Sequence, residues 1–232
     1  MGKDKLFSYF ISFEGLDAVG KTTLANSLYN YLTSELKLPV KMFPEFSNSA
    51  IGILLVDLIK QYNFIKLDPA INTPLAETLL LMADLCAKAE LIESSGSQLP
   101  IIIADRYFDS LIAYQVPRIL RNNPHLGNDD TTEWLTNIAE RILLKPDITF
   151  LINLPMDVIC SRVQSRDSYQ PSFEDIEFFA QAYSIFTSLM SKDRQRFYQI
   201  DGHRDTDDIL SEIISVVANG LLNQGLIEDP IK

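Results

Sequence analysis

The chain has 232 residues, 47% of them hydrophobic, and a formal net charge of -11. This length and apolar content allow one sizeable core, and no Gly/Ser/Pro-rich linker interrupts the chain, so we expect a single domain over residues 1–232. The acidic balance argues against binding of DNA or RNA through the phosphate backbone, which requires a basic face.

Cysteine usage and hydropathy indicate the compartment. Cys86 and Cys160 lack the spacing of a metal site or a disulfide framework, which suits a reducing environment. No apolar run approaches the roughly 18 residues that cross a bilayer, and the N-terminal residues lack the pattern of a secretory leader. We therefore expect a soluble, cytoplasmic protein without a membrane partner.

Short apolar runs alternate along the chain with longer helical patterns. The runs predict strands over residues 6–13, 40–43, 101–104, 148–153 and 197–200. The intervening patterns predict helices over residues 21–36, 50–62, 73–94, 131–144, 155–166, 173–192 and 206–223. Because the strands are apolar on both faces, we expect an α/β fold in which helices cover both sides of a parallel sheet.

The first predicted strand runs into a glycine-containing loop that matches G-x-x-x-x-G-K-[ST] from Gly15 to Thr22. Such a loop directs successive N–H groups at one anion, Lys21 adds a mobile charge, and the Thr22 hydroxyl is placed for Mg²⁺. A strand-to-helix turn without a ligand is the alternative. Asp17 would repel nucleotide phosphates, so we expect its carboxylate to face a second substrate and accept from a sugar hydroxyl, unless it is simply a solvent-facing loop residue.

Ligands of open parallel sheets bind beyond the carboxyl ends of the strands, where this chain places several polar residues. Pro44 and Glu45 follow the second predicted strand, and Asp105 and Arg106 follow the third. Asp105 is a candidate to hold Mg²⁺, with a helix N-cap as the alternative. The guanidinium of Arg106 is suited to grip an acceptor phosphate, with a structural salt bridge as the alternative.

Two arginines precede an irregular, polar stretch late in the chain. Arg162 and Arg166 lie four residues apart and therefore on one face of a predicted helix. We interpret residues 163–173 as a lid that can bring one of these arginines to a transferring phosphoryl group, with a slight preference for Arg166. Solvent-exposed arginines that only pair with acids are the alternative.

These motifs together resemble the thymidylate kinases, a family of P-loop nucleoside-monophosphate kinases. The similarity runs from about residue 7 to 217. It is strongest in Phe13-Glu14-Gly15-Leu16-Asp17 with Gly20-Lys21-Thr22-Thr23, and in Asp105-Arg106-Tyr107 with Ser110 and Ala113-Tyr114-Gln115. The resemblance implies a P-loop kinase fold with a five-stranded parallel sheet and a short lid. It also implies a homodimer joined through helices.

The resemblance further implies site roles. ATP would bind along the loop, at Gly15, Leu16, Asp17, Ala18, Val19, Gly20, Lys21, Thr22 and Thr23. The acceptor would bind at Asp17 through its 3′-hydroxyl, at Arg106 through its phosphate, and at Pro44, Glu45, Tyr114 and Gln115. Mg²⁺ would bind at Thr22 and Asp105. Because Ala18 replaces the basic loop residue of some members, the lid arginines would supply catalysis together with Lys21 and Arg106.

The chain departs from the family at the acceptor base and phosphate. Met42 and Phe46 stand where many relatives have arginines, and the helix that normally carries an arginine beside thymine has none between Met82 and Lys88. Lys88 is a candidate to replace that arginine, although an ammonium lacks the planar fork of a guanidinium.

The function that these features favour is ATP- and Mg²⁺-dependent phosphorylation of dTMP to dTDP in pyrimidine deoxynucleotide synthesis. A deoxynucleoside kinase, in which Glu45 would take a proton from a 5′-hydroxyl, is the nearest alternative. A kinase for another pyrimidine monophosphate, such as dUMP, and an inactive nucleotide-binding protein are further alternatives. A GTPase is disfavoured because the chain has no Asn-Lys-x-Asp motif.

Overall fold

A computed structural model describes residues 8–61, 73–93 and 101–228. Its centre is a five-stranded parallel sheet with the strand order β2-β3-β1-β4-β5. The strands are β1 (Tyr9–Glu14), β2 (Val40–Phe43), β3 (Ile101–Asp105), β4 (Ile148–Asn153) and β5 (Phe197–Asp201). All five predicted strands are confirmed, and with them the predicted α/β fold class; residues 6 and 7 of the first prediction lie outside the described residues.

Nine helical segments surround the strands in the described part of the chain. They are α1 (Lys21–Asn30), the π-helical turn η1 (Tyr31–Glu35), α2 (Ala50–Gln61), α3 (Pro74–Glu93), α4 (Phe108–Asn122), α5 (Asn128–Ile142), α6 (Met156–Asp167), α7 (Phe173–Lys192) and α8 (Thr206–Asn223). None of these described helices is long and apolar enough to span a bilayer.

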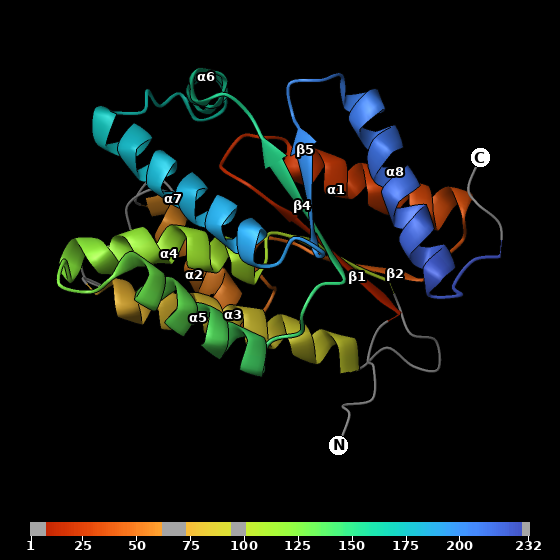
Figure 1. The fold of residues 1–232 in the computed structure, drawn as a ribbon, viewed down its shortest axis with the longest axis horizontal. Coiled ribbons are helices and arrows are strands. Elements are labelled where there is room, and N and C mark those ends of the chain that lie inside the picture. Colours follow the sequence, from red (N-terminus) through yellow and green to blue (C-terminus); the bar gives the residue numbers. More distant parts are fainter. Residues whose placement is uncertain (1–7, 62–72, 94–100, 229–232) are drawn as a thin grey trace.

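The helices form a layer on each face of the sheet (Figure 1). Helices α1 and α8 pack together on one face, while α3, α4, α5 and α7 form the thicker layer on the other. Every residue of β1 and of β3 is buried as a result. The two-sided apolar character of the strands thus has its physical reason, because neither face of the central strands contacts water.

Helix α4 was absent from the sequence prediction, which also began the next helix three residues late. Ten of its 15 residues are buried, and it packs against α3, α5 and α7. Two features explain why the sequence did not predict this helix. Three of its buried residues, Asp109, Ser110 and Gln115, are polar, and Pro117 lies in its interior, where the missing N–H ordinarily argues against a helix.

The sheet brings the carboxyl ends of its strands to one edge. The phosphate loop follows β1, Glu45 follows β2, and Arg106 follows β3. Since β1 lies between β3 and β4, the loop sits beside the end of β3, at the point where the strand order reverses.

Candidate active site

The loop between β1 and α1 has the backbone that its glycines predict. Gly15 and Gly20 have φ angles of 135° and 101°, which side chains with a Cβ disfavour. A Cβ on Gly15 would also lie 2.5 Å from the carbonyl oxygen of Ile152 in β4. Glycine at position 15 therefore allows both the turn and its close packing against the neighbouring strand.

Lys21 is the first residue of α1 and is only 6% exposed. Its Nζ donates to the carbonyl oxygen of Leu16 at 2.7 Å, so the ammonium lies across the loop. Burial, reinforced by the positive charge of Arg106, lowers the pKa of Lys21 to about 8 despite nearby carboxylates. The site thus holds a cation in poorly hydrated surroundings, where attraction to an anion is strong.

The two candidate magnesium ligands lie together. The Thr22 hydroxyl donates to Oδ2 of Asp105 at 2.6 Å, which joins the start of α1 to the end of β3. Asp105 is buried, whereas the Thr22 side chain is exposed toward the loop. A hydroxyl and a carboxylate are the hard oxygen donors that Mg²⁺ accepts beside phosphate oxygens, so these residues fit the ion.

Arg106 is the best-anchored cation of the site. Its φ of 64° is unusual for a residue with a side chain. Its guanidinium pairs with Asp17, lies 3.1 Å from Oε1 of Glu45 through Nε, and donates through Nη1 to the carbonyl of Gly15 at 2.9 Å and to Ser110 Oγ at 3.1 Å. Arg106 therefore links the ends of β1, β2 and β3.

Glu14 holds the residues that follow Arg106 in place. Sequence reasoning did not single it out as a functional residue. It is fully buried and accepts from the backbone N–H of Tyr107 at 2.9 Å and from the Ser110 hydroxyl. Burial and the charge of Asp109 raise the pKa of Glu14 to about 8. Its position directly before Gly15, at the end of a buried strand, was the available signal.

Asp17 lines the same cavity as Arg106 and pairs with its guanidinium. Burial raises the pKa of its carboxyl, but the positive charges of Arg106, Lys21 and Arg166 outweigh burial and leave the pKa below its ordinary value. The Asp17 carboxyl is therefore held in its ionised form, and acceptance of a hydrogen bond from a sugar hydroxyl stays a prediction for it.

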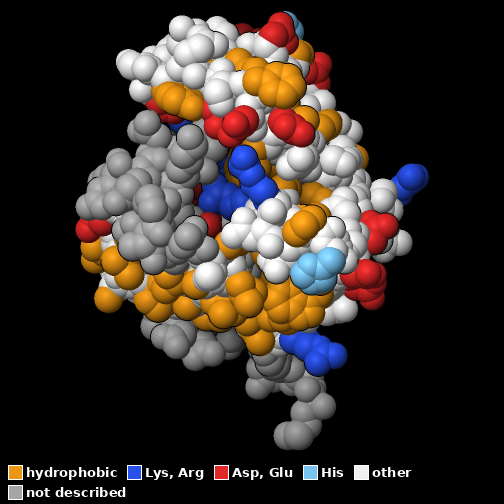
Figure 2. Space-filling view, turned by 90° about the vertical axis from the view of Figure 1, so that its left-hand side faces the viewer, with side chains coloured by type: hydrophobic (Ala, Val, Ile, Leu, Met, Phe, Trp, Pro, Cys, Tyr) orange, Lys and Arg blue, Asp and Glu red, His pale blue; other side chains and the backbone are white. Residues whose placement is uncertain are grey.

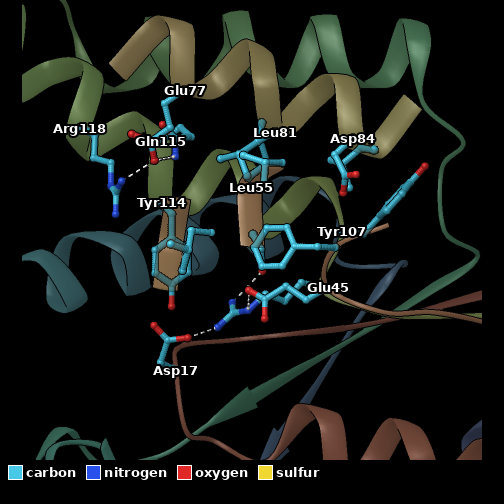
Figure 3. Close-up of a pocket in the computed structure, with 16 residues that line it drawn as sticks. Asp17, Glu45, Leu55, Glu77, Leu81, Asp84, Tyr107, Tyr114, Gln115 and Arg118 are labelled. Atoms are coloured by element: carbon cyan, nitrogen blue, oxygen red, sulfur yellow. Dashed lines mark hydrogen bonds and ion pairs between the residues drawn. The ribbon is translucent and has the colours of Figure 1, made fainter. Parts of the chain in front are cut away.

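A cavity extends from Asp17 and Arg106 between α2, α3 and α4 (Figure 3). Its walls are mainly apolar and include Phe46, Leu55, Ile59, Leu81, Leu85 and Leu111. Tyr114 and Gln115 line it, as expected for acceptor-binding residues, and the guanidinium of Arg106 lies 5.1 Å from the centre of the Tyr114 ring.

Sequence reasoning missed Arg118 and Glu77, which lie at the end of the cavity away from Asp17 (Figure 3). Arg118 follows Leu111, Tyr114 and Gln115 at helical spacing, so the four residues share one face of α4. This spacing was a usable signal, but it is visible only once residues 108–122 are recognised as a helix.

Pro44 and Lys88 do not line the cavity, although both were predicted to bind the acceptor. Lys88 is 1% exposed, donates to the carbonyl oxygen of Glu45 at 2.5 Å, and lies 3.8 Å from Asp84. In this structure Lys88 therefore contacts the segment that carries Glu45 rather than the cavity. The reason is that Lys88 lies one turn beyond Asp84 and Leu85, the last of the described α3 residues that line the cavity.

The two candidate lid arginines lie near the loop at the end of α6. Arg162 donates to the carbonyl oxygen of Ala18 at 3.4 Å, and Arg166 pairs with Asp167 at 2.7 Å. Both side chains are exposed. Arg166 is close enough for its charge to lower the pKa of Asp17.

The space-filling view shows basic side chains at the floor of a central hollow, with acidic side chains on its upper border (Figure 2). In a chain with a net charge of -11, such a local group of cations indicates a site for anions rather than a general surface property.

A parallel α/β sheet with a phosphate loop after its first strand and a cationic cavity beside that loop defines a P-loop kinase. A family model described as "Thymidylate kinase" matches residues 13–213, and the chain belongs to that family. This result confirms the resemblance on which the site roles depend.

Individual relatives agree with the family. The chain is 30% identical over 221 residues to "Thymidylate kinase" of Sulfurihydrogenibium sp., covering 94% of this chain and 99% of the relative. It is also 30% identical over 213 residues to "Probable thymidylate kinase 1" of Saccharolobus solfataricus, covering 91% and 97%. A crystal structure of thymidylate kinase from Ehrlichia chaffeensis has the same fold, with a TM-score of 0.64, 24% identity and coverage of 90% of this chain and 97% of that chain.

Proposed function

We propose that this protein transfers the γ-phosphoryl group of ATP to dTMP, giving dTDP, with Mg²⁺ as cofactor. The observation that carries the proposal is the cavity that begins at Arg106 and Asp17, directly beside the phosphate loop. Family membership supports the same reaction.

The donor half of the site is the loop from Gly15 to Thr23. Its backbone N–H groups and the Lys21 ammonium bind the ATP phosphates, while Thr22 and Asp105 hold Mg²⁺. The ion would neutralise charge on the transferring phosphoryl group. On binding, Lys21 exchanges the carbonyl of Leu16 for a phosphate oxygen, which is the stronger, charge-assisted partner.

The acceptor half is the cavity. Arg106 binds the dTMP phosphate, Asp17 accepts from the 3′-hydroxyl, and Tyr114 and Gln115 contact the nucleoside. Glu45 has 42% of its side chain exposed, whereas Asp17 has 21% exposed. We therefore expect the acceptor phosphate to replace Glu45, rather than Asp17, as a partner of Arg106.

Catalysis in this scheme is alignment and charge stabilisation. The acceptor phosphate is already an anionic nucleophile, so no side chain needs to remove a proton. A lid arginine, Arg166 or Arg162, adds positive charge when residues 163–173 close over ATP. We also propose that the protein acts as a homodimer joined through α2 and α3, which expose Ile53, Leu54, Leu75 and Leu79.

The proposal is tested by ADP release from ATP and Mg²⁺ with a panel of dTMP, dUMP, dCMP and thymidine. We expect the highest kcat/KM with dTMP. Turnover of thymidine without turnover of dTMP would instead support a deoxynucleoside kinase that uses Glu45 as its base. Nucleotide binding without ADP release from any acceptor would identify an inactive binding protein.

A further inference from the structure

The cavity has two polar ends separated by apolar walls (Figure 3). One end holds Asp17 and Arg106, beside the phosphate loop. The other end holds Glu77, Gln115 and Arg118, from α3 and α4. If the acceptor phosphate binds at Arg106, as in the proposed function on which this inference rests, the apolar walls flank the sugar and base, and the edge of the base reaches the second end.

The side chains at the second end hold one another in place. Gln115 Nε2 donates to Oε1 of Glu77 at 2.9 Å, and its Oε1 accepts from the Thr78 hydroxyl at 3.0 Å. Arg118 pairs with the same carboxylate oxygen of Glu77, and its guanidinium lies 5.1 Å from the centre of the Phe178 ring. A carboxylate and an aromatic face therefore fix the orientation of this guanidinium.

Arg118 supplies the cavity with a positive charge, whereas the charged residues of α3 that line it, Glu77 and Asp84, are acids. The described residues of α3 that line the cavity are Glu77, Leu81, Asp84 and Leu85, none of which is a cation, and Lys88 does not line it. Among the described residues that line the cavity, the cationic ones are Arg106 and Arg118. With Arg106 assigned to phosphate, the cation available to the base comes from α4.

We infer that Arg118 is a specificity-determining residue that donates a hydrogen bond to a carbonyl oxygen on the base of the acceptor, with Glu77 orienting it. A guanidinium donates and cannot accept, so it matches the O4 carbonyl of thymine and not the exocyclic amino group of cytosine. The site would thus distinguish keto from amino pyrimidines by a side chain on α4.

The test is steady-state kinetics of Arg118→Met with dTMP and dCMP. We expect the KM for dTMP to rise about 10- to 100-fold, the size of one lost hydrogen bond to a charged group, with kcat and the KM for ATP near wild type. The preference for dTMP over dCMP should fall by at least about 10-fold, because the variant loses a donor and leaves Glu77 to accept from the cytosine amino group. Arg121→Met is the matched control, since Arg121 lies one turn further along α4 with 75% of its side chain exposed.

A purely structural role would give a different result. If Arg118 only ties α4 to Glu77 of α3, Arg118→Met lowers the melting temperature and leaves the dTMP/dCMP preference unchanged, which overturns the inference. Arg118→Lys keeps a positive charge beside Glu77 should the methionine variant not fold. It is expected to raise the KM for dTMP about 3- to 10-fold, and wild-type KM and preference in this variant would also overturn the inference. Should thymidine prove to be the acceptor, the proposed function fails, and the same comparison with thymidine and deoxycytidine still decides the role of Arg118.

Discussion

At the scale of single residues, the burial of the Lys21 ammonium favours the binding of an anion but lowers the stability of the ligand-free fold. The ammonium is buried beside Arg106, and its pKa in the folded protein is lowered to about 8 from 10.5. Below pH 8 the lysine is charged in both the folded and the unfolded chain, so the folded state bears the full cost of burying it. Between about pH 8 and 10.5 the unfolded chain binds more protons, and stability rises with pH.

We therefore predict that Lys21→Met lowers kcat by about 10²–10³ but stabilises the ligand-free protein. The gain should be about 1–3 kcal/mol below pH 8 and should shrink as the pH rises toward and above 10.5, because the wild-type lysine then becomes neutral in the unfolded state as well as in the folded state. Thermal denaturation of both proteins across this range measures it. Lys192→Met, at an exposed position on α7, is the control. A stability difference that is the same at pH 7 and pH 10 would contradict the explanation.

At the scale of elements, the positions and lengths of the strands could be predicted because burial on both faces leaves a continuous apolar run, whereas their order in the sheet came only from the structure. The phosphate loop could be predicted because its chemistry depends on a contiguous motif. Helix α4 was not recognised, because polar residues such as Asp109 and Gln115 are among its buried residues and because Pro117 argued against a helix. The position of Arg118 was lost with that helix, and the role of Lys88 depends on a tertiary contact with Glu45 that no local pattern encodes.

The segment after β2 is held to α3 by a buried polar network, and this network makes a prediction about Lys88. Asp84 accepts from the backbone N–H of Ser47 at 3.1 Å, and Lys88 donates to the carbonyl of Glu45, whose carboxylate pairs with Arg106. Lys88 thus acts on Arg106 through the Glu45 segment.

We predict that Lys88→Met raises the KM for the acceptor about 10-fold and leaves the KM for ATP unchanged, because the lost hydrogen bond loosens the segment of Glu45 and Phe46, which line the cavity, and Lys88 makes that bond to this segment rather than to the phosphate loop. The decisive measurement is a double-mutant cycle with Glu45→Gln. If Lys88 acts through Glu45, Lys88→Met should raise the KM for the acceptor little further when Glu45→Gln is already present. Fully additive losses would show that Lys88 acts elsewhere.

The end of α6 carries the next prediction. Arg166 influences Asp17 electrostatically, whereas Arg162 contacts the loop through the carbonyl of Ala18. We expect Arg166→Ala to lower kcat by about 10²–10³ and Arg162→Ala to have the smaller effect, with unchanged melting temperatures because both side chains are exposed. Single-turnover phosphoryl transfer measures the effect, and Arg121→Ala is the control. Equal rates in the wild type and both variants would exclude a catalytic role for this segment.

At the scale of the whole molecule, the two helical layers have unequal surfaces. Helices α2 and α3 pack together and expose four large apolar side chains, Ile53, Leu54, Leu75 and Leu79, between 47% and 57%. Exposed apolar clusters on neighbouring elements are typical of interaction surfaces. In the proposed homodimer one side of α3 would meet the protein core and the other the second copy, which would account for apolar residues all around its axis.

A change at this surface should alter the association of the protein without altering its fold. We predict that the wild-type protein sediments at about twice its chain mass of 26.3 kDa, and that Leu79→Glu, alone or with Ile53→Glu, sediments as a monomer. The physical reason is that two symmetry-related carboxylates would be buried at the interface without partners, while in the monomer both remain in water. Analytical ultracentrifugation makes the measurement, with Trp134→Glu as the control, because Trp134 is 44% exposed on α5, outside these two helices. Dissociation by Trp134→Glu and not by Leu79→Glu would move the interface from α2 and α3 to α5.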